Sequence, residues 1–222
     1  PITPVPNGFR RIEAIVNQGA AYYNGLTARL NKRFSEHFSA QASYTWSHSL
    51  ATVDWDGTGS QQQPLDSTQL GGEELADSIY DQRHRAVITG WYQMPWQVSL
   101  GTSMQFASAR PYNVTTGVDN NGDGVNNDRA FIDQTVVRRN AARSTPIIDL
   151  ATFVEKAFRF SERVSFSVRG EAFNLINHQN VLVRNGVWGN GSTPNSSFGN
   201  AVGGINNIDP ARQFQFQARL RF

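Results

Sequence analysis

The last ten residues, Gln213-Phe214-Gln215-Phe216-Gln217-Ala218-Arg219-Leu220-Arg221-Phe222, decide the fold class. Apolar residues occupy every even position of this segment, and Gln or Arg occupies every odd position. Successive side chains of a β-strand point to opposite faces, whereas a helix would scatter both sets around its circumference. The pattern therefore predicts a strand with one apolar and one polar face.

The same alternation recurs along the chain and predicts about eight antiparallel strands. In 26–34, for example, Leu26, Ala28, Leu30 and Phe34 are expected on one face and the intervening polar residues on the other. Several strands approach the 9–11 residues that cross a bilayer when a strand is tilted. The clear segments are 26–34, 38–47, 98–106, 163–172 and 212–222, and weaker ones are 9–17, 83–94 and 147–160.

The connections between these strands alternate in length. Short turns are expected near 35–37, 95–96 and 161–162, and long polar segments at about 51–82, 110–146 and 176–211. Up-and-down outer-membrane barrels sort their connections in this way, with tight periplasmic turns and long external loops, whereas a soluble sandwich has turn signals at more even spacing. The predicted fold is therefore an all-β, antiparallel transmembrane β-barrel segment with long extracellular loops.

Composition narrows the function. The 222 residues include no cysteine, which excludes disulfides and thiolate chemistry, and the net charge of +2 is too small to indicate a nucleic-acid partner. Mean hydropathy is −0.45, which suits barrel strands because they alternate lipid-facing and lumen-facing residues. No Gly-x-Ser-x-Gly motif is present, and we expect the protein not to be an enzyme.

In a barrel the apolar face would contact outer-membrane lipid and the polar face would line a wet lumen. Trp46, Trp91 and Trp96, with Tyr44 and Tyr92, would suit aromatic girdles at the membrane interfaces, although β-propensity alone explains them equally well. The residues expected to face the lumen are Arg29, Arg33, Arg169, Glu171, Gln215 and Arg219.

One polar loop has the spacing of a calcium site. Asp119, Asn121 and Asp123, followed by Gly124, resemble positions 1, 3, 5 and 6 of an EF-hand-like loop, and Val125 would add its carbonyl oxygen. Position 12 is an alanine where such loops have a bidentate Glu, but Asp128 could replace it. The alternative is a solvated turn rich in Asn, Gly and Asp. Ca²⁺ is therefore the one cofactor that the sequence suggests.

Other charged residues are interpreted as ordinary surface. The pairs Glu73-Glu74 and Asp54 with Asp56 lie in a polar loop and are expected to be solvated rather than catalytic. The pairs Arg10-Arg11 and Arg138-Arg139 could meet lipopolysaccharide phosphates or a ligand, but ordinary charge at strand ends is the favoured interpretation.

Four sets of motifs resemble the C-terminal part of TonB-dependent outer-membrane receptors, and most closely the Oar-like group that carries a carboxypeptidase-regulatory-like domain. The first runs from Tyr23-Asn24-Gly25-Leu26 through Asn31-Lys32-Arg33-Phe34 to Ala42-Ser43-Tyr44-Thr45-Trp46-Ser47. The others are Asp81-Gln82-Arg83-His84-Arg85, Gly170-Glu171-Ala172-Phe173-Asn174-Leu175-Ile176-Asn177-His178, and the terminal strand ending in Phe222. The likeness covers nearly the whole chain.

The resemblance implies a 22-stranded barrel with a plug in its lumen, in the outer membrane of a Gram-negative bacterium. Residues 1–222 would then be the C-terminal part of that barrel, and the plug and N-terminal domains would lie upstream. The implied partners are the remainder of the same barrel and plug, TonB through an N-terminal segment not found here, and the barrel-assembly machinery. Phe222 would be the assembly signal that this machinery reads.

Four functions are weighed, of which an enzyme at the barrel rim would need convergent acids and bases that the sequence does not show. The first of the other three is a TonB-dependent receptor that takes up a bulky nutrient, and siderophores, cobalamin, glycans and peptides all remain open as its substrate. The second is a structural or adhesive surface protein without transport. The third is a self-contained eight-stranded barrel, although the many Ser, Gly and Ala residues of its polar face would fill such a narrow lumen poorly.

Overall fold

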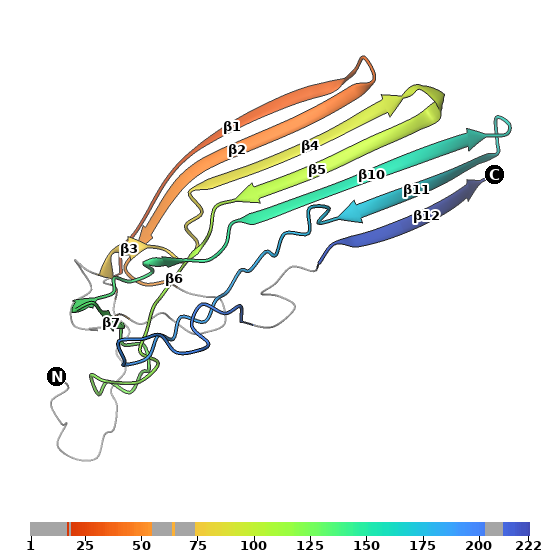
Figure 1. Ribbon diagram of the computed structural model, residues 1–222. Helices are drawn as coiled ribbons and strands as arrows, with labels where there is room; N and C mark the ends of the chain where they lie inside the picture. The colour runs from red at the N-terminus through yellow and green to blue at the C-terminus, as the bar shows by residue number, and fades with distance from the viewer. Residues whose placement is uncertain (1–16, 18, 55–63, 65–73, 203–210) are drawn as a thin grey trace.

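The computed structural model describes residues 17, 19–54, 64, 74–202 and 211–222. Within this part the molecule is one broad, gently curved antiparallel sheet with a layer of loops at one end (Figure 1). No helix of the described residues is long and apolar enough to span a membrane.

Seven long strands build the sheet, in the order β1-β2-β4-β5-β10-β11-β12. Each long strand therefore pairs with the next long strand along the chain, which is an up-and-down topology. The strands are β1 (Ala21–Ser35), β2 (Phe38–Ala51), β4 (His84–Met94), β5 (Val98–Ala107), β10 (Ile147–Arg159), β11 (Ser165–Phe173) and β12 (Gln213–Arg221). Their lengths of 9 to 15 residues are sufficient to cross a bilayer.

The residues paired across neighbouring long strands share the same parity throughout the sheet. Odd-numbered residues pair with odd-numbered residues and even with even across all six interfaces, apart from a shift at the end of β1. Since side chains alternate along each strand, one face of the sheet consists of odd positions and the other of even positions. We call these the odd face and the even face.

Tight turns join the strands at one end of the sheet. The turn between β1 and β2 consists of Glu36 and His37, both with positive φ (52° and 71°), as a type I′ hairpin turn requires. The three-residue 3₁₀ turn η2 (Pro95–Gln97) joins β4 to β5, and residues 160–164 join β10 to β11. All three turns lie at the end away from the loop layer (Figure 1).

The described parts of the long connections gather at the opposite end. Residues 52–83, 108–146 and 174–212 follow β2, β5 and β11 respectively. They contain the two-residue strands β3 (Ala76–Asp77), which pairs with β2, β6 (Pro111–Tyr112), which pairs with β9 (Ala142–Arg143), and β7 (Phe131–Ile132), which pairs with β8 (Thr135–Val136).

The apolar residues of the sheet do not form a core. The fully buried apolar side chains of the described residues are small, and most lie in or beside the loop layer: Ala51, Ala107, Val114, Ala130, Ala172 and Val181. The large ones on the even face are exposed, including Phe216 at 82% and Leu30 at 71%. A surface of this kind needs an apolar medium around it, which a bilayer provides.

The predicted fold class is confirmed in its strand positions, its antiparallel order and its alternation of short and long connections. Seven of the eight expected strands are present. Their boundaries lie within two residues of the expected ones, except that β1 begins five residues earlier and β2 ends four residues later. The eighth, 9–17, lies almost wholly outside the described residues.

Candidate functional site

Five of the six residues predicted to line a lumen lie on the odd face, and the sixth, Arg33, lies in the irregular end of β1. Arg29 lies opposite Ser43, Arg219 opposite Ser167, and Gln215 opposite Glu171. Arg169 lies between Glu155 and Gln217. The odd face is therefore polar and charged across several neighbouring strands, as the sequence predicts, although the pairing alone does not test which medium it meets.

Four side chains of the odd face, those of Arg169, Phe153, Glu171 and Glu155, form a connected cluster. The Arg169 guanidinium stacks on the Phe153 ring, 3.7 Å from its centroid, and pairs with Glu171 and, at 4.0 Å, with Glu155. The Phe153 ring in turn lies over Gly101, where an added Cβ would be 2.0 Å from the ring. Only glycine leaves room for this arrangement, so Gly101 determines where Arg169 is held.

The end of β1 departs from the predicted alternation. The register shifts between Lys32 and Ser35, as in a β-bulge, and Arg33 lies within this irregular step. Phe34 then contacts Trp91 of the odd face, with ring centroids 5.0 Å apart. The prediction that Phe34 shares a face with Leu30 is therefore wrong, because the extra residue reverses the alternation.

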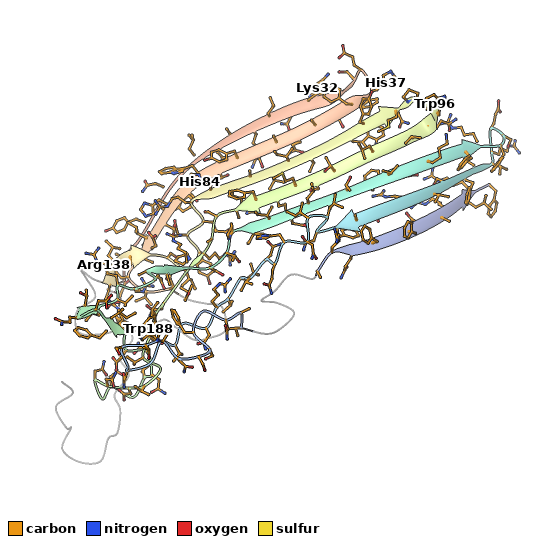
Figure 2. The ribbon with its side chains drawn as sticks, in the orientation of Figure 1. Lys32, His37, His84, Trp96, Arg138 and Trp188 are labelled. Carbon is orange, nitrogen blue, oxygen red and sulfur yellow. The ribbon has the colours of Figure 1, made fainter. Side chains whose placement is uncertain are left out.

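The even face is aromatic near both of its ends. Tyr44 lies at the middle of β2, Trp46 lies nearer its loop end, and Tyr92 lies near the turns. Trp91 is on the odd face, which removes it from the predicted girdle, and Trp96 is 83% exposed in the turn η2 (Figure 2). This distribution suits interfacial aromatic residues, which present an apolar ring and a polar edge.

Two threonines in the middle of the even face have partners for their hydroxyl groups. Thr152 donates to the carbonyl oxygen of Gly101 at 2.9 Å, and Thr102 donates to that of Ala151 at 3.3 Å. Both partners are backbone atoms of the adjacent strand. A hydroxyl with an acceptor of this kind can lie in an apolar medium at low cost, so these residues do not interrupt the apolar surface.

The loop layer contains a buried ion pair. Arg139 and Asp54 are 2.6 Å apart, and their side chains are 2% and 3% exposed. Asp54 also accepts hydrogen bonds from Asn140 Nδ2 at 3.1 Å and from the backbone N–H of Ile79 at 3.0 Å. Burial lowers the pKa of Arg139 from its usual value, while the charges of Asp54 and Glu74 act in the opposite direction.

Glu74 has a second buried arginine. Arg129 pairs with its carboxylate, and both side chains are nearly inaccessible. The prediction that Asp54 and Glu74 form a solvated surface is therefore wrong, because arginines from a loop more than fifty residues away neutralise them. Asp56 and Glu73 lie outside the described residues.

The motif Asp81-Gln82-Arg83-His84-Arg85 anchors the loop layer to the sheet. Asp81 is fully buried, accepts the backbone N–H of Ser49 at 2.9 Å, and pairs with Arg83 at 3.4 Å and Arg143 at 3.2 Å. The same two arginines also contact Asp77. One carboxylate pair therefore ties β2 and β3 to the loop that precedes β4 and to β9.

A second motif shapes the chain after β11. Asn174 and Asn177 have positive φ, 46° and 55°, and Asn174 exchanges hydrogen bonds of 2.9 Å with the backbone of His178. Asn180, which is 1% exposed, then donates to and accepts from the backbone of Ile148 at 3.1 and 2.8 Å. These asparagines lead the chain away from the strand and dock the loop beside β10.

The predicted calcium loop is a dense set of side-chain-to-backbone hydrogen bonds. Asp119 accepts the backbone N–H groups of Gly122 at 2.7 Å and Gly124 at 2.8 Å, and Asp123 accepts that of Val125 at 2.8 Å. Asp128 accepts that of Asn121 at 3.1 Å through Oδ2. Its Oδ1 is buried and has no hydrogen-bond partner among the described residues.

No group of three or more His, Cys, Asp or Glu side chains in the described part of the chain is arranged to hold a metal ion. A calcium loop also uses amide and backbone oxygens, so the site predicted at Asp119, Asn121, Asp123, Val125 and Asp128 stays a prediction. The orphaned oxygen of Asp128 fits a missing cation, whereas the backbone donors at Asp119 fit a self-contained turn.

Two further predicted features lie at opposite ends of the molecule: Phe222 at the turn end of the sheet, and the pair Arg138-Arg139 in the loop layer. Phe222, the predicted assembly signal, follows β12 directly and is 96% exposed. Arg138 and Arg139 are adjacent in the sequence but differ in burial. Arg139 is buried, whereas Arg138 is exposed (Figure 2). The residues Arg10 and Arg11 lie outside the described part.

Comparison with known proteins agrees with this geometry. The family model described as "Outer membrane beta barrel domain" matches residues 1–136 and 132–215, which together span nearly the whole chain. A search of curated proteins found no match. The open antiparallel sheet with one apolar and one polar face is consistent with part of such a barrel. The chain therefore belongs to the outer membrane β-barrel domain family, whose place is the outer membrane of Gram-negative bacteria.

Proposed function

We propose that this chain is the C-terminal barrel portion of a TonB-dependent receptor that takes up a bulky nutrient across the outer membrane. The observation that carries the proposal is the open sheet: its polar odd face is broad, and its seven described long strands do not close into a barrel among themselves. Apolar-out, polar-in strands around a wide lumen are the architecture that such transport needs.

The two edges of the sheet support a barrel larger than the described part. β1 and β12 lie at opposite sides of the sheet, and neither has a second partner strand among the described residues (Figure 1). An unpaired strand edge inside a bilayer leaves backbone N–H and C=O groups without partners, at a cost of several kcal/mol for each group. In this proposal, further strands of the barrel pair with these two edges.

The odd face supports a lumen wide enough to admit a plug or a ligand. Besides the Arg169 cluster, the odd face carries small residues such as Ser43, Ser103 and Ser167. A barrel of only eight strands has an interior filled by its own side chains, which these small residues would fill poorly. The lumen-facing role of the predicted residues follows from this proposal, and so do the plug and TonB as partners upstream.

The loop layer supports selectivity at the external end. Its buried pairs, Arg139 with Asp54 and Arg129 with Glu74, hold long connections in a defined shape. A binding surface made of loops loses less entropy on binding a ligand when the loops are already ordered. The proposal assigns no catalytic residue to this chain.

Uptake in cells that lack the gene tests the proposal. Strains that lack the full-length gene, TonB, or both would be grown with limiting siderophore-bound iron, cobalamin, glycan or peptide. The proposal predicts a growth defect on one of these nutrients that loss of TonB reproduces and that the double deletion does not deepen. Equal growth of all strains on the whole panel would contradict it.

A structural or adhesive surface protein is the second candidate. The observation that favours it is the same ordered loop layer, which would present a fixed surface to another cell or matrix. Surface attachment that depends on the gene but persists without TonB would support this candidate over transport. A full-length gene that encodes no plug would do the same.

A further inference from the structure

A pocket of about 540 Å³ opens where β2 meets the loop layer. Its lining combines cationic side chains with apolar ones and includes His48, Leu50, Leu75, Arg83, Arg138 and Arg143. The pocket is distinct from the odd-face cluster around Arg169, and the proposed transport does not use it.

The register of β2 and β3 places this pocket on the even face. His48 and Leu50 are even-numbered residues of β2, and Asp77 of β3 lies directly opposite Leu50. On the same face, Trp46 lies one step closer to the middle of the strand. Because the even face is the apolar surface of the barrel and Trp46 suits the interface, the pocket lies at the level of the lipid headgroups.

One arginine of the pocket, Arg138, is not neutralised by a carboxylate of the described residues. Arg83 and Arg143 share the carboxylates of Asp77 and Asp81, so their charges are balanced. Arg138 is exposed and has no carboxylate partner in the described part of the chain. Figure 2 shows Arg138 just beyond the loop end of β1 and β2.

We propose that this pocket binds the phosphate of a lipid headgroup in the outer leaflet. The planar guanidinium of Arg138 presents paired donors that match phosphate oxygens, and Leu50 and Leu75 offer apolar contact for the first part of an acyl chain. A soluble anion would use the arginines but not the leucines. The proposal rests on the position of the chain in the outer membrane and not on transport.

Native mass spectrometry of the full-length protein in detergent tests this proposal, with diphosphorylated lipid A as the probe. Arg138→Gln is expected to weaken lipid A retention about tenfold, the size typical of a lost charge-assisted hydrogen bond. Arg163→Gln is the matched control, because Arg163 is also an exposed arginine but lies in the turn at the other end of the sheet. Its retention should match that of the unaltered protein.

Competition separates a lipid site from a site for free anions. Millimolar inorganic phosphate should leave lipid A bound to the unaltered protein, since it lacks the acyl contacts. Displacement by inorganic phosphate would overturn the proposal, and so would equal retention in the two variants. Both substitutions are at exposed positions, and unchanged heat-modifiable migration on gels would verify that each variant is folded.

Discussion

Replacing Phe216 with arginine is the substitution that most sharply separates the two faces of the sheet. Phe216 is on the even face of β12, is 82% exposed, and packs its ring over Gly170 of the adjacent strand. The predicted orientation of the strands places this ring in lipid. Arg at the same position would place a charge where neither water nor a carboxylate is available, since the opposite residue is glycine.

The expected loss of stability follows from the depth of position 216 in the bilayer. β12 has nine residues, Gln213–Arg221, and Phe216 lies one residue, or about 3 Å, from its midpoint. An arginine near the bilayer midplane on the lipid face destabilises a barrel by roughly 2–4 kcal/mol. This corresponds to about a 30-fold or larger change in the folding equilibrium. Gln215→Arg is the control, because Gln215 is on the odd face opposite Glu171 and should change stability by less than about 1 kcal/mol.

The assay is urea-dependent folding of the purified full-length protein in phospholipid vesicles, followed by heat-modifiable migration on gels. The expected result is a lower midpoint for the Phe216 variant and an unchanged midpoint for the Gln215 variant. Equal shifts in the two variants would show that both faces meet the same medium, and the reasoning from alternation would then fail.

Three further results are expected. Arg139→Ala should destabilise the loop layer by about 3–5 kcal/mol because it leaves Asp54 buried without its cation; hydrogen exchange should accelerate there, and an equal effect of Arg138→Ala would contradict this. Millimolar calcium should slow exchange in the loop around Asp123, since an ion that binds only the ordered loop stabilises it. Asp123→Ala should abolish that slowing, and exchange that is unaffected by calcium in the unaltered protein would reduce the motif to a polar turn. Deletion of Phe222 from the full-length protein should lower its level in outer-membrane fractions, and an unchanged level would contradict its role as an assembly signal.

The strands were predictable because the two media around them differ. A wall with lipid on one side and water on the other imposes a period of two, and Phe214, Phe216 and Leu220 follow this period without exception. The lengths of the connections also predicted the up-and-down topology, because short turns and long loops alternate along such a sheet. Even β4, whose pattern is interrupted by Val87 and Trp91, was found within one residue.

The bulge in β1 could not be predicted from the pattern. One additional residue between Lys32 and Ser35 reverses the alternation, yet the residues there read as a continuous strand. The result is that Phe34 packs on Trp91 across the odd face. A register shift depends on how two strands meet, and this information is not present in either strand alone.

The buried ion pairs of the loop layer were also missed. Asp54 and Glu74 lie in polar surroundings in the sequence, where exposure is the reasonable expectation. Their partners, Arg139 and Arg129, are more than fifty residues away and reach them only after the long connections fold together. In the sequence, the motif around Asp81 indicates only a family resemblance. The structure shows that it ties β2 and β3 to the loop before β4 and to β9.

The central claim is that the seven strands cross the outer membrane with their even face in lipid. Because the chain has no cysteine, single cysteines introduced along 213–221 would carry spin labels at unique positions. In the full-length barrel in bilayers, collision with oxygen and with a water-soluble relaxation agent would be measured at each position. The claim predicts opposite two-residue oscillations, with oxygen access highest at even positions such as 214, 216 and 220. Access that is uniform along the strand, or highest to the aqueous agent at even positions, would contradict it.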